Sequence, residues 1–158
     1  MTEKPDIVRS VIQELEEPEG LDWGIRIFIK REDLIHDSIS GNKWRKLKYN
    51  LEEAGKLGYK KLLTFGGAYS NHIHAVAAAG RIFGFETVGV IRGEPYPGIN
   101  DTLRSANSNG MKLYYLDRRR YGHKYDPENL GLLAKEFGDF YLIPEGGSNS
   151  MAIKDAWK

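Results

Sequence analysis

The sequence has no cysteine, no long apolar run and almost no net charge. The absence of cysteine excludes disulfides, thiolate metal sites and thiol nucleophiles. The N-terminal stretch MTEKPDIVRSVIQELEE lacks the apolar core of a signal peptide, and no run elsewhere is long enough to cross a bilayer. Because 23 Lys and Arg face 22 Asp and Glu, the overall charge does not favour nucleic acid or membranes as partners. We therefore expect a cytoplasmic protein.

The chain of 158 residues is long enough for an ordinary domain with a core, and strands alternate with helices from about residue 60 onward. The expected strands cover 60–65, 86–93, 111–117 and 140–147. The expected helices cover 70–84, 100–110 and 126–138, and each ends at a glycine. This alternation predicts an α/β fold, a parallel sheet flanked by helices in three layers, with right-handed connections.

Two other stretches carry simpler patterns. IRIFIK, residues 25–30, alternates strictly, which predicts a strand with Ile25, Ile27 and Ile29 on one face. DRRRYGHKYD, residues 117–126, is the most polar stretch of the chain. We expect it to be a solvated loop rather than a binding patch.

A further helix is expected from about residue 42 to residue 56. Its apolar stripe consists of Trp44, Leu47, Leu51 and Ala54. Lys43 lies at the edge of this stripe, whereas Arg45 and Lys46 are expected to point to solvent. Lys43 therefore differs from the basic residues around it.

The position of Lys43 predicts a lowered pKa for its amine. The positive end of the helix dipole, the neighbouring cations and partial burial all disfavour the ammonium form. A neutral amine is the form that attacks a carbonyl carbon. Two other interpretations stay open at this point: the side chain snorkels beside a wet basic surface, or the basic helix contacts a phosphate.

The stretch FGGAYSNHIH, residues 65–74, predicts a tight turn from a strand into a helix that starts at Ser70 or Asn71. Free amides and the helix dipole at such an end favour an anion, and both side chains add donors. In a parallel sheet this turn lies at the carboxyl ends of the strands, where ligands bind. A carboxylate or phosphate ligand is one interpretation, and simple capping of the helix is the other.

His72 and His74 do not form a metal site in this pattern, because residues two apart on a helix do not face each other and no cysteine can complete the set. We therefore expect no metal. His72, near the helix start, could instead hydrogen-bond a ligand or transfer a proton. PEGGSNS, residues 144–150, is another glycine turn after a strand, with a helix expected from near Ser150.

Four motifs occur in an order and spacing that resemble one enzyme family. They are KREDL (30–34), SGNKWRKL (40–47), GGAYSNH (66–72) and PEGGSN (144–149). Together they resemble the pyridoxal-phosphate enzymes of the 1-aminocyclopropane-1-carboxylate deaminase and D-cysteine desulfhydrase group, which have the fold type II, or tryptophan-synthase-β-like, architecture. The resemblance covers nearly the whole chain.

The resemblance implies a role for each matching residue. Lys43 matches the lysine that forms the internal aldimine with pyridoxal 5'-phosphate and moves protons at the substrate's α-carbon. Asn42 would shape the turn before it and contribute to the cofactor site. Ser70 matches the active-site serine, and Asn71 would contact the cofactor's ring hydroxyl and the substrate carboxylate. His72 would line the substrate site.

The resemblance also implies a domain plan and an assembly. Residues 1–51 would start the large domain, 52–144 would form the small α/β domain, and 145–158 would begin the return to the large domain. Family members are longer, so the resemblance implies a truncated chain without the phosphate-binding loop or the partner of the pyridine nitrogen. Such enzymes pair as homodimers, and we also expect association through the face that the truncation leaves exposed.

The predicted function is a deaminase or desulfhydrase, a hydrolase or lyase of amino acid metabolism that acts on a small amino acid. Two alternatives of other classes stay open. One is a non-enzymatic α/β module whose turn at 66–72 binds a simple anion. The other is an interaction protein that exposes apolar residues such as Trp44 and Leu47.

Overall fold

The computed structural model describes residues 10–16, 24–36, 38–39, 41–95 and 98–150. Their central element is a parallel sheet of four strands in the order β5-β4-β3-β6. The strands are β3 (Lys61–Gly66), β4 (Glu86–Arg92), β5 (Met111–Leu116) and β6 (Tyr141–Ile143). The last strand therefore lies beside the first of the four, and all four carboxyl ends meet at one edge of the sheet.

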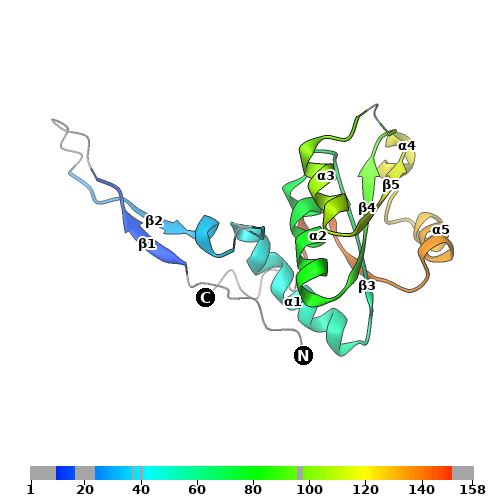
Figure 1. Ribbon diagram of the computed structural model, residues 1–158, viewed down its shortest axis with the longest axis horizontal. Helices are drawn as coiled ribbons and strands as arrows, with labels where there is room; N and C mark the ends of the chain where they lie inside the picture. Colours follow the sequence, from blue (N-terminus) through cyan, green and yellow to red (C-terminus); the bar gives the residue numbers. More distant parts are fainter. Residues whose placement is uncertain (1–9, 17–23, 37, 40, 96–97, 151–158) are drawn as a thin grey trace.

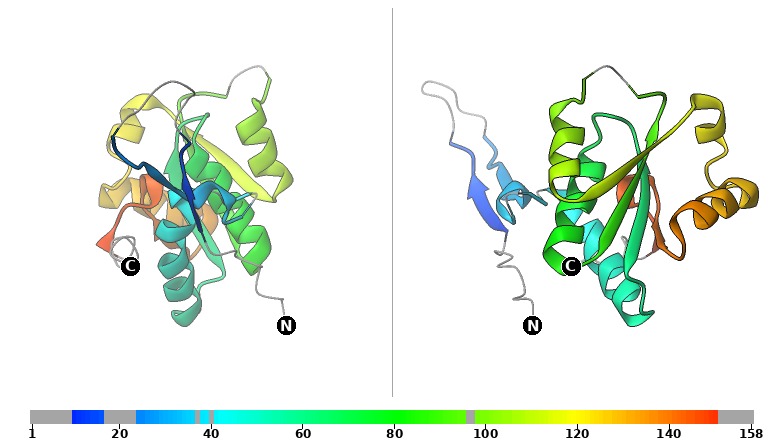
Figure 2. Two further views of the ribbon diagram at one scale, coloured as in Figure 1. Left: turned by 90° about the vertical axis from the view of Figure 1, so that its left-hand side faces the viewer. Right: turned by 45° about the vertical axis from the view of Figure 1, so that its right-hand side comes forward.

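Helices cover both faces of this sheet (Figures 1 and 2). One face packs against α1 (Asn42–Lys56), α2 (Asn71–Phe83) and α3 (Asp101–Ser108). The other packs against α4 (Arg118–Gly122) and α5 (Pro127–Phe137). Successive residues of β3 alternate between the two cores, with Leu62 in the first and Leu63 in the second, as a strand buried on both sides requires. The predicted three-layer α/β fold is confirmed.

The ends of the helices follow the sequence signals closely. The side chain of Ser70 caps α2, and Gly84 ends that helix in the left-handed conformation at φ 75°. Asn100 caps α3 through its side chain, and Pro127 occupies the first turn of α5. The helix expected near Ser150 lies outside the described residues.

The expected loop at 117–126 is a wrong prediction, because α4 forms inside it. The side chain of Asp117 accepts hydrogen bonds from the backbone amides of Arg119 and Arg120 and so starts the helix. Tyr121 is then buried against Phe65 of β3, with ring centroids 6.0 Å apart. The polar composition of the stretch gave no signal for this anchoring side chain.

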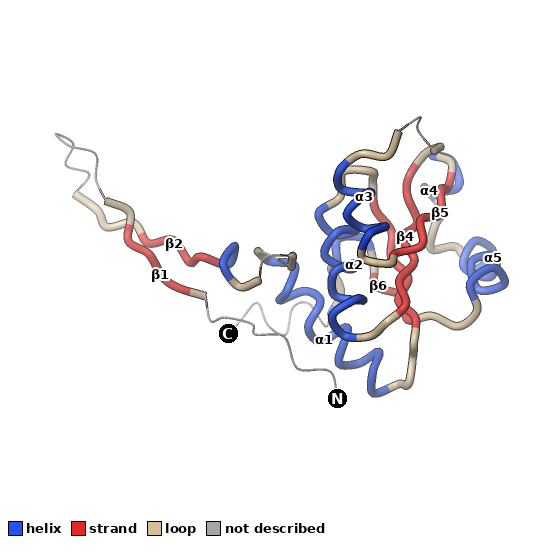
Figure 3. Tube along the Cα trace, viewed as in Figure 1, coloured by secondary structure: helices blue, strands red, loops and turns tan. Residues whose placement is uncertain are grey.

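A ribbon of two antiparallel strands lies apart from the sheet (Figure 3). Its strands are β1 (Val11–Glu14), which was not predicted, and β2 (Phe28–Arg31). β2 starts later than the expected strand 25–30. The short helix η1 (Glu32–Leu34) follows it and leads toward α1.

Candidate functional site

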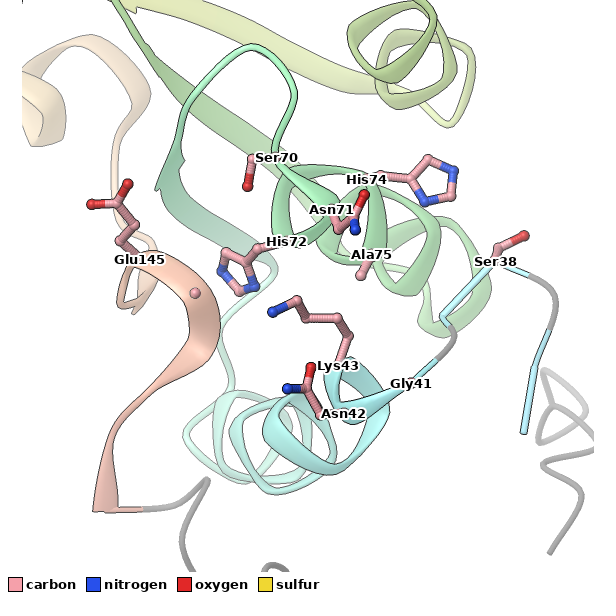
Figure 4. A pocket seen from close by; sticks show the side chains of 11 residues that line it. Ser38, Gly41, Asn42, Lys43, Ser70, Asn71, His72, His74, Ala75 and Glu145 are labelled. Carbon is pink, nitrogen blue, oxygen red and sulfur yellow. The ribbon is translucent and has the colours of Figure 1, made fainter. Parts of the chain in front are cut away.

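A cavity of about 480 Å³ opens between the start of α1, the start of α2 and the turn η2 (Glu145–Gly147). Its lining residues are Ser38, Gly41, Asn42, Lys43, Ser70, Asn71, His72, His74, Ala75, Glu145 and Gly146. The cavity lies where β3 ends, which is the ligand-binding edge of parallel sheets. It therefore contains every residue that the sequence placed in the site, although α1 and α2 are separate in the chain (Figure 4).

Lys43 reaches into this cavity from the first turn of α1. The helix starts after Gly41, whose φ of 64° favours glycine and whose amide donates to the Glu32 carbonyl at 2.9 Å. The Lys43 side chain is half-buried and extends toward the His72 ring (Figure 4). Burial first, and the charge of Lys46 second, lower the pKa of the Lys43 amine, in the direction predicted from the sequence.

The expectation that Arg45 points to solvent is wrong. Arg45 binds the Glu32 carboxylate through two nitrogens, at 2.7 and 2.9 Å, and this pairing lowers the pKa of Glu32. Lys46 donates to the hydroxyl of Ser148 at 3.0 Å. Both partners belong to segments that fold back onto α1, so helical periodicity alone could not indicate them.

Ser70 and Asn71 supply the α2 side of the cavity. The Ser70 hydroxyl accepts a bond from the Ile73 amide at 3.4 Å, so the capping interpretation holds for this residue while it also lines the cavity. Asn71 is exposed as the first residue of α2, where backbone amides have no partner within the helix. This end of the helix is therefore suited to an anionic group.

The glycine turn before α2 is required by close packing. A Cβ atom on Gly66 would lie 2.5 Å from a side-chain carbon of Ile73 and 2.9 Å from the Ser70 hydroxyl. Any larger residue at this position would push the start of α2 out of the cavity wall.

His72 is 2% exposed and lies against β3. Its Nε2 atom is 2.8 Å from the Thr64 hydroxyl, which donates to the Ile143 carbonyl at 2.9 Å. Its Nδ1 atom is buried and has no hydrogen-bond partner among the described residues. Burial first, and the charges of Lys43 and Lys46 next, lower the pKa of His72 to about 4, while the Pro144 backbone acts in the opposite direction. The ring is therefore neutral at neutral pH.

Sequence analysis missed two polar residues that hold the site together. Thr64 holds the His72 ring, and the only signal for it is one hydroxyl in the apolar strand KLLTF. Asn50 of α1 is fully buried, where its side chain donates to the Lys46 carbonyl at 2.7 Å and accepts from Asn149 at 2.7 Å. It fastens the turn after β6 to α1, and its signal is a buried amide within an amphipathic helix.

Within 10–16, 24–36, 38–39, 41–95 and 98–150, no group of three His, Asp or Glu residues is placed to hold a metal ion. Within the same ranges, no helix has both the length and the apolar character that crossing a bilayer requires.

Comparison with known proteins identifies relatives of the chain, although no family profile matches it. One relative is a protein of Thermotoga maritima that is provisionally named 1-aminocyclopropane-1-carboxylate deaminase. It is 36% identical over 132 residues, and the match covers 82% of this chain and 42% of that protein. The bifunctional D-cysteine desulfhydrase/1-aminocyclopropane-1-carboxylate deaminase of Arabidopsis thaliana is 31% identical over 84% of this chain and 35% of its own. The D-cysteine desulfhydrase of Klebsiella pneumoniae is 31% identical over 81% of this chain and 40% of its own.

Solved structures similar to this chain include a protein described by the same enzyme name. The crystal structure of a homologue of ACC deaminase superposes with a TM-score of 0.74 and 28% identity, over 93% of this chain and 45% of that one. A hydrogen sulfide-producing enzyme of Fusobacterium nucleatum shares the fold at a TM-score of 0.62, with 17% identity over 87% of this chain and 43% of that one. The chain spans about two fifths of the length of the curated relatives it matches. Over that span it is a homologue of proteins named 1-aminocyclopropane-1-carboxylate deaminase and D-cysteine desulfhydrase.

Proposed function

We propose that this chain contributes the lysine-bearing part of the active site of a pyridoxal-phosphate-dependent deaminase or desulfhydrase that acts on a small amino acid. The observation that carries the proposal is the meeting of Lys43, Ser70, Asn71 and His72 in one cavity at the carboxyl end of β3. The names of the relatives support substrates of the 1-aminocyclopropane-1-carboxylate or D-cysteine kind.

The residues of the cavity fit the chemistry of this cofactor. Lys43 offers a half-buried amine with a lowered pKa, which is the nucleophile that a pyridoxal aldehyde requires. When bound, the cofactor supplies an electron sink for the bond that breaks at the α-carbon of the amino acid. Lys43 would hold the cofactor covalently through Nζ and move the proton at that carbon.

The start of α2 would orient the substrate. The free amides of its first turn and the side chain of Asn71 are donors for a carboxylate, and Asn71 would also meet the cofactor's ring hydroxyl. Ser70 lines the same wall, where its hydroxyl would act on the substrate. Asn42, the first residue of α1, would contribute to the cofactor site. His72 would line the substrate site.

Several broader features belong to the same proposal. Residues 1–51 would be the start of a large domain, 52–144 a small domain and 145–158 the start of the return. A homodimer in the cytoplasm is the expected assembly, with a small amino acid as the substrate. The exposed apolar residues of β1 and β2 are consistent with such association.

Covalent trapping tests the proposal directly. We expect pyridoxal phosphate to give a visible absorption band with the chain, and borohydride to fix the cofactor on the peptide that contains Lys43. Lys43→Ala should abolish both signals. Lys48→Ala, five residues further along α1, is the matched control and should preserve them.

An unchanged band in Lys43→Ala, or a label on other lysines only, would overturn the assignment of the cofactor lysine. If phosphate alone bound at α2 and pyridoxal phosphate gave no band, the anion-binding alternative would take its place.

A further inference from the structure

The hydrogen bonds around Thr64 fix the tautomer of His72. A threonine hydroxyl has a single proton, and Thr64 donates it to the Ile143 carbonyl at 2.9 Å. Its oxygen can then only accept from His72 Nε2, which lies 2.8 Å away. The Nε2 atom therefore carries the ring proton, and Nδ1 presents a lone pair.

That lone pair is buried on the α1 side of the ring. Nδ1 is buried without a hydrogen-bond partner among the described residues, which is costly for a polar atom. The backbone at Gly147 covers one flank so closely that a Cβ there would lie 3.2 Å from His72 Cε1. The Lys43 amine lies on the remaining flank, with one ring nitrogen turned toward it (Figure 4).

We propose that His72, held as the Nε2–H tautomer by Thr64, is the hydrogen-bond acceptor that positions the amine of Lys43. A neutral primary amine has two N–H groups and one lone pair. If one N–H points at Nδ1, the lone pair is turned toward the open cavity, where an aldehyde carbon would arrive. His72 is thus a positioning residue, and this inference rests on the proposed function of Lys43.

The other charged groups around His72 do not compete for this bond. Lys46 on α1 donates to Ser148, and Glu145 on η2 is bound by the Tyr121 hydroxyl at 2.9 Å and by Lys124 at 3.2 Å. In the part of the chain that the structure describes, no ion pair joins Lys43 to a carboxylate. These contacts leave Nδ1 open to the amine of Lys43, while the Pro144 backbone also interacts with the ring and favours its protonated form.

Nitrogen NMR of the ring tests the first half of the proposal in the chain without cofactor. We expect wild type and Thr64→Ser to show the pure Nε2–H tautomer, and Thr64→Val to show loss of that preference. Thr87→Val, a buried threonine on neighbouring β4, is the matched control and should leave His72 unchanged. An Nδ1–H tautomer in wild type would overturn the proposal.

The reactivity of Lys43 tests the second half, again without cofactor. An acceptor favours the ammonium form, so removing it should lower the pH at which Lys43 becomes reactive toward an acylating reagent. We expect His72→Phe to lower this midpoint by about one pH unit, a tenfold change in the protonation equilibrium. His72→Asn, whose side-chain oxygen can replace Nδ1, should restore most of the shift.

An unchanged or raised midpoint in a folded His72→Phe chain would contradict the role of His72. Wild type gives an independent measurement that requires no variant: the Nδ1 resonance should shift with the same midpoint as Lys43. If cofactor trapping succeeds but this resonance does not follow Lys43, the positioning role alone fails. If the resonance follows Lys43 but no cofactor binds, the proposed function alone fails.

Discussion

Large apolar side chains differ in exposure between the sheet with its helices and the ribbon of β1 and β2. In the sheet, Phe65 and Leu62 are fully buried between helices. In the ribbon, Ile12 is 66% and Phe28 52% exposed. The paired residues explain the difference, because each face of the ribbon alternates apolar with charged or polar side chains, such as Ile12 opposite Lys30.

This contrast shows that an alternating pattern predicts a paired strand but does not predict that one of its faces is buried. Strict alternation correctly indicated extended chain near residues 25–30, yet Ile25, Ile27 and Ile29 share no buried face. A ribbon of two strands is marginal by itself, so its attachment to the rest of the chain matters. Glu32 provides that attachment, since its carboxylate binds Arg45 and its carbonyl accepts from Gly41.

The largest expected effect comes from removing a large side chain of the sheet. Phe65→Ala should lower the free energy of unfolding by about 3–5 kcal/mol, because it leaves a cavity beside Tyr121 and Tyr125. Phe28→Ala in the ribbon should cost at most about 1 kcal/mol. Urea unfolding followed by circular dichroism measures both. Equal losses would contradict the contrast between the two regions.

Acid should weaken the sheet region through His72. Its pKa is about 4 in the folded chain against 6.5 ordinarily, so between these values only the unfolded chain binds the proton. Stability should therefore fall as the pH falls through this range, with roughly 3 kcal/mol attributable to this ring. Urea unfolding at several pH values should show that the free energy of unfolding depends less steeply on pH in His72→Asn than in the wild type.

A smaller effect is expected where a helix approaches the sheet. A Cβ on Gly80 of α2 would lie 2.2 Å from Thr87 Cγ2 and 3.0 Å from the Phe85 carbonyl, so Gly80→Ala should cost about 1–3 kcal/mol. Gly131→Ala in α5 has open space and is the matched control, with a gain of about 0.5–1 kcal/mol. Thermal unfolding of both variants gives the comparison. An unchanged free energy of unfolding in Gly80→Ala would show that α2 can move away from the sheet without cost.

The smallest effect is expected in the ribbon itself. Ile12→Thr should change the free energy of unfolding by less than about 0.5 kcal/mol, because the side chain is already in solvent. Urea unfolding is the measurement, and sedimentation of both chains reports any change in self-association. A loss above about 1.5 kcal/mol would mean that another surface covers the ribbon in solution.

The features that the sequence allowed us to predict are those encoded by neighbouring residues. Ser70 and Gly84 mark the ends of α2, and the helical wheel distinguishes Lys43, which lines the cavity, from its basic neighbours. The features that escaped prediction depend on segments far apart in the chain. The partners of Arg45 and Lys46, Glu32 and Ser148, lie in other segments, and Thr64 becomes important only because β6 lies beside β3.

The order of strands has a consequence for a chain that is made from one end. At about 5–20 residues per second, β6 leaves the ribosome roughly 4 to 15 seconds after β3. Until then, one border of β3 has unpaired backbone groups and Thr64 lacks its carbonyl partner. The nascent chain therefore carries Lys43 for several seconds before the wall of its pocket exists, which makes this interval the time when a misplaced strand would do most harm.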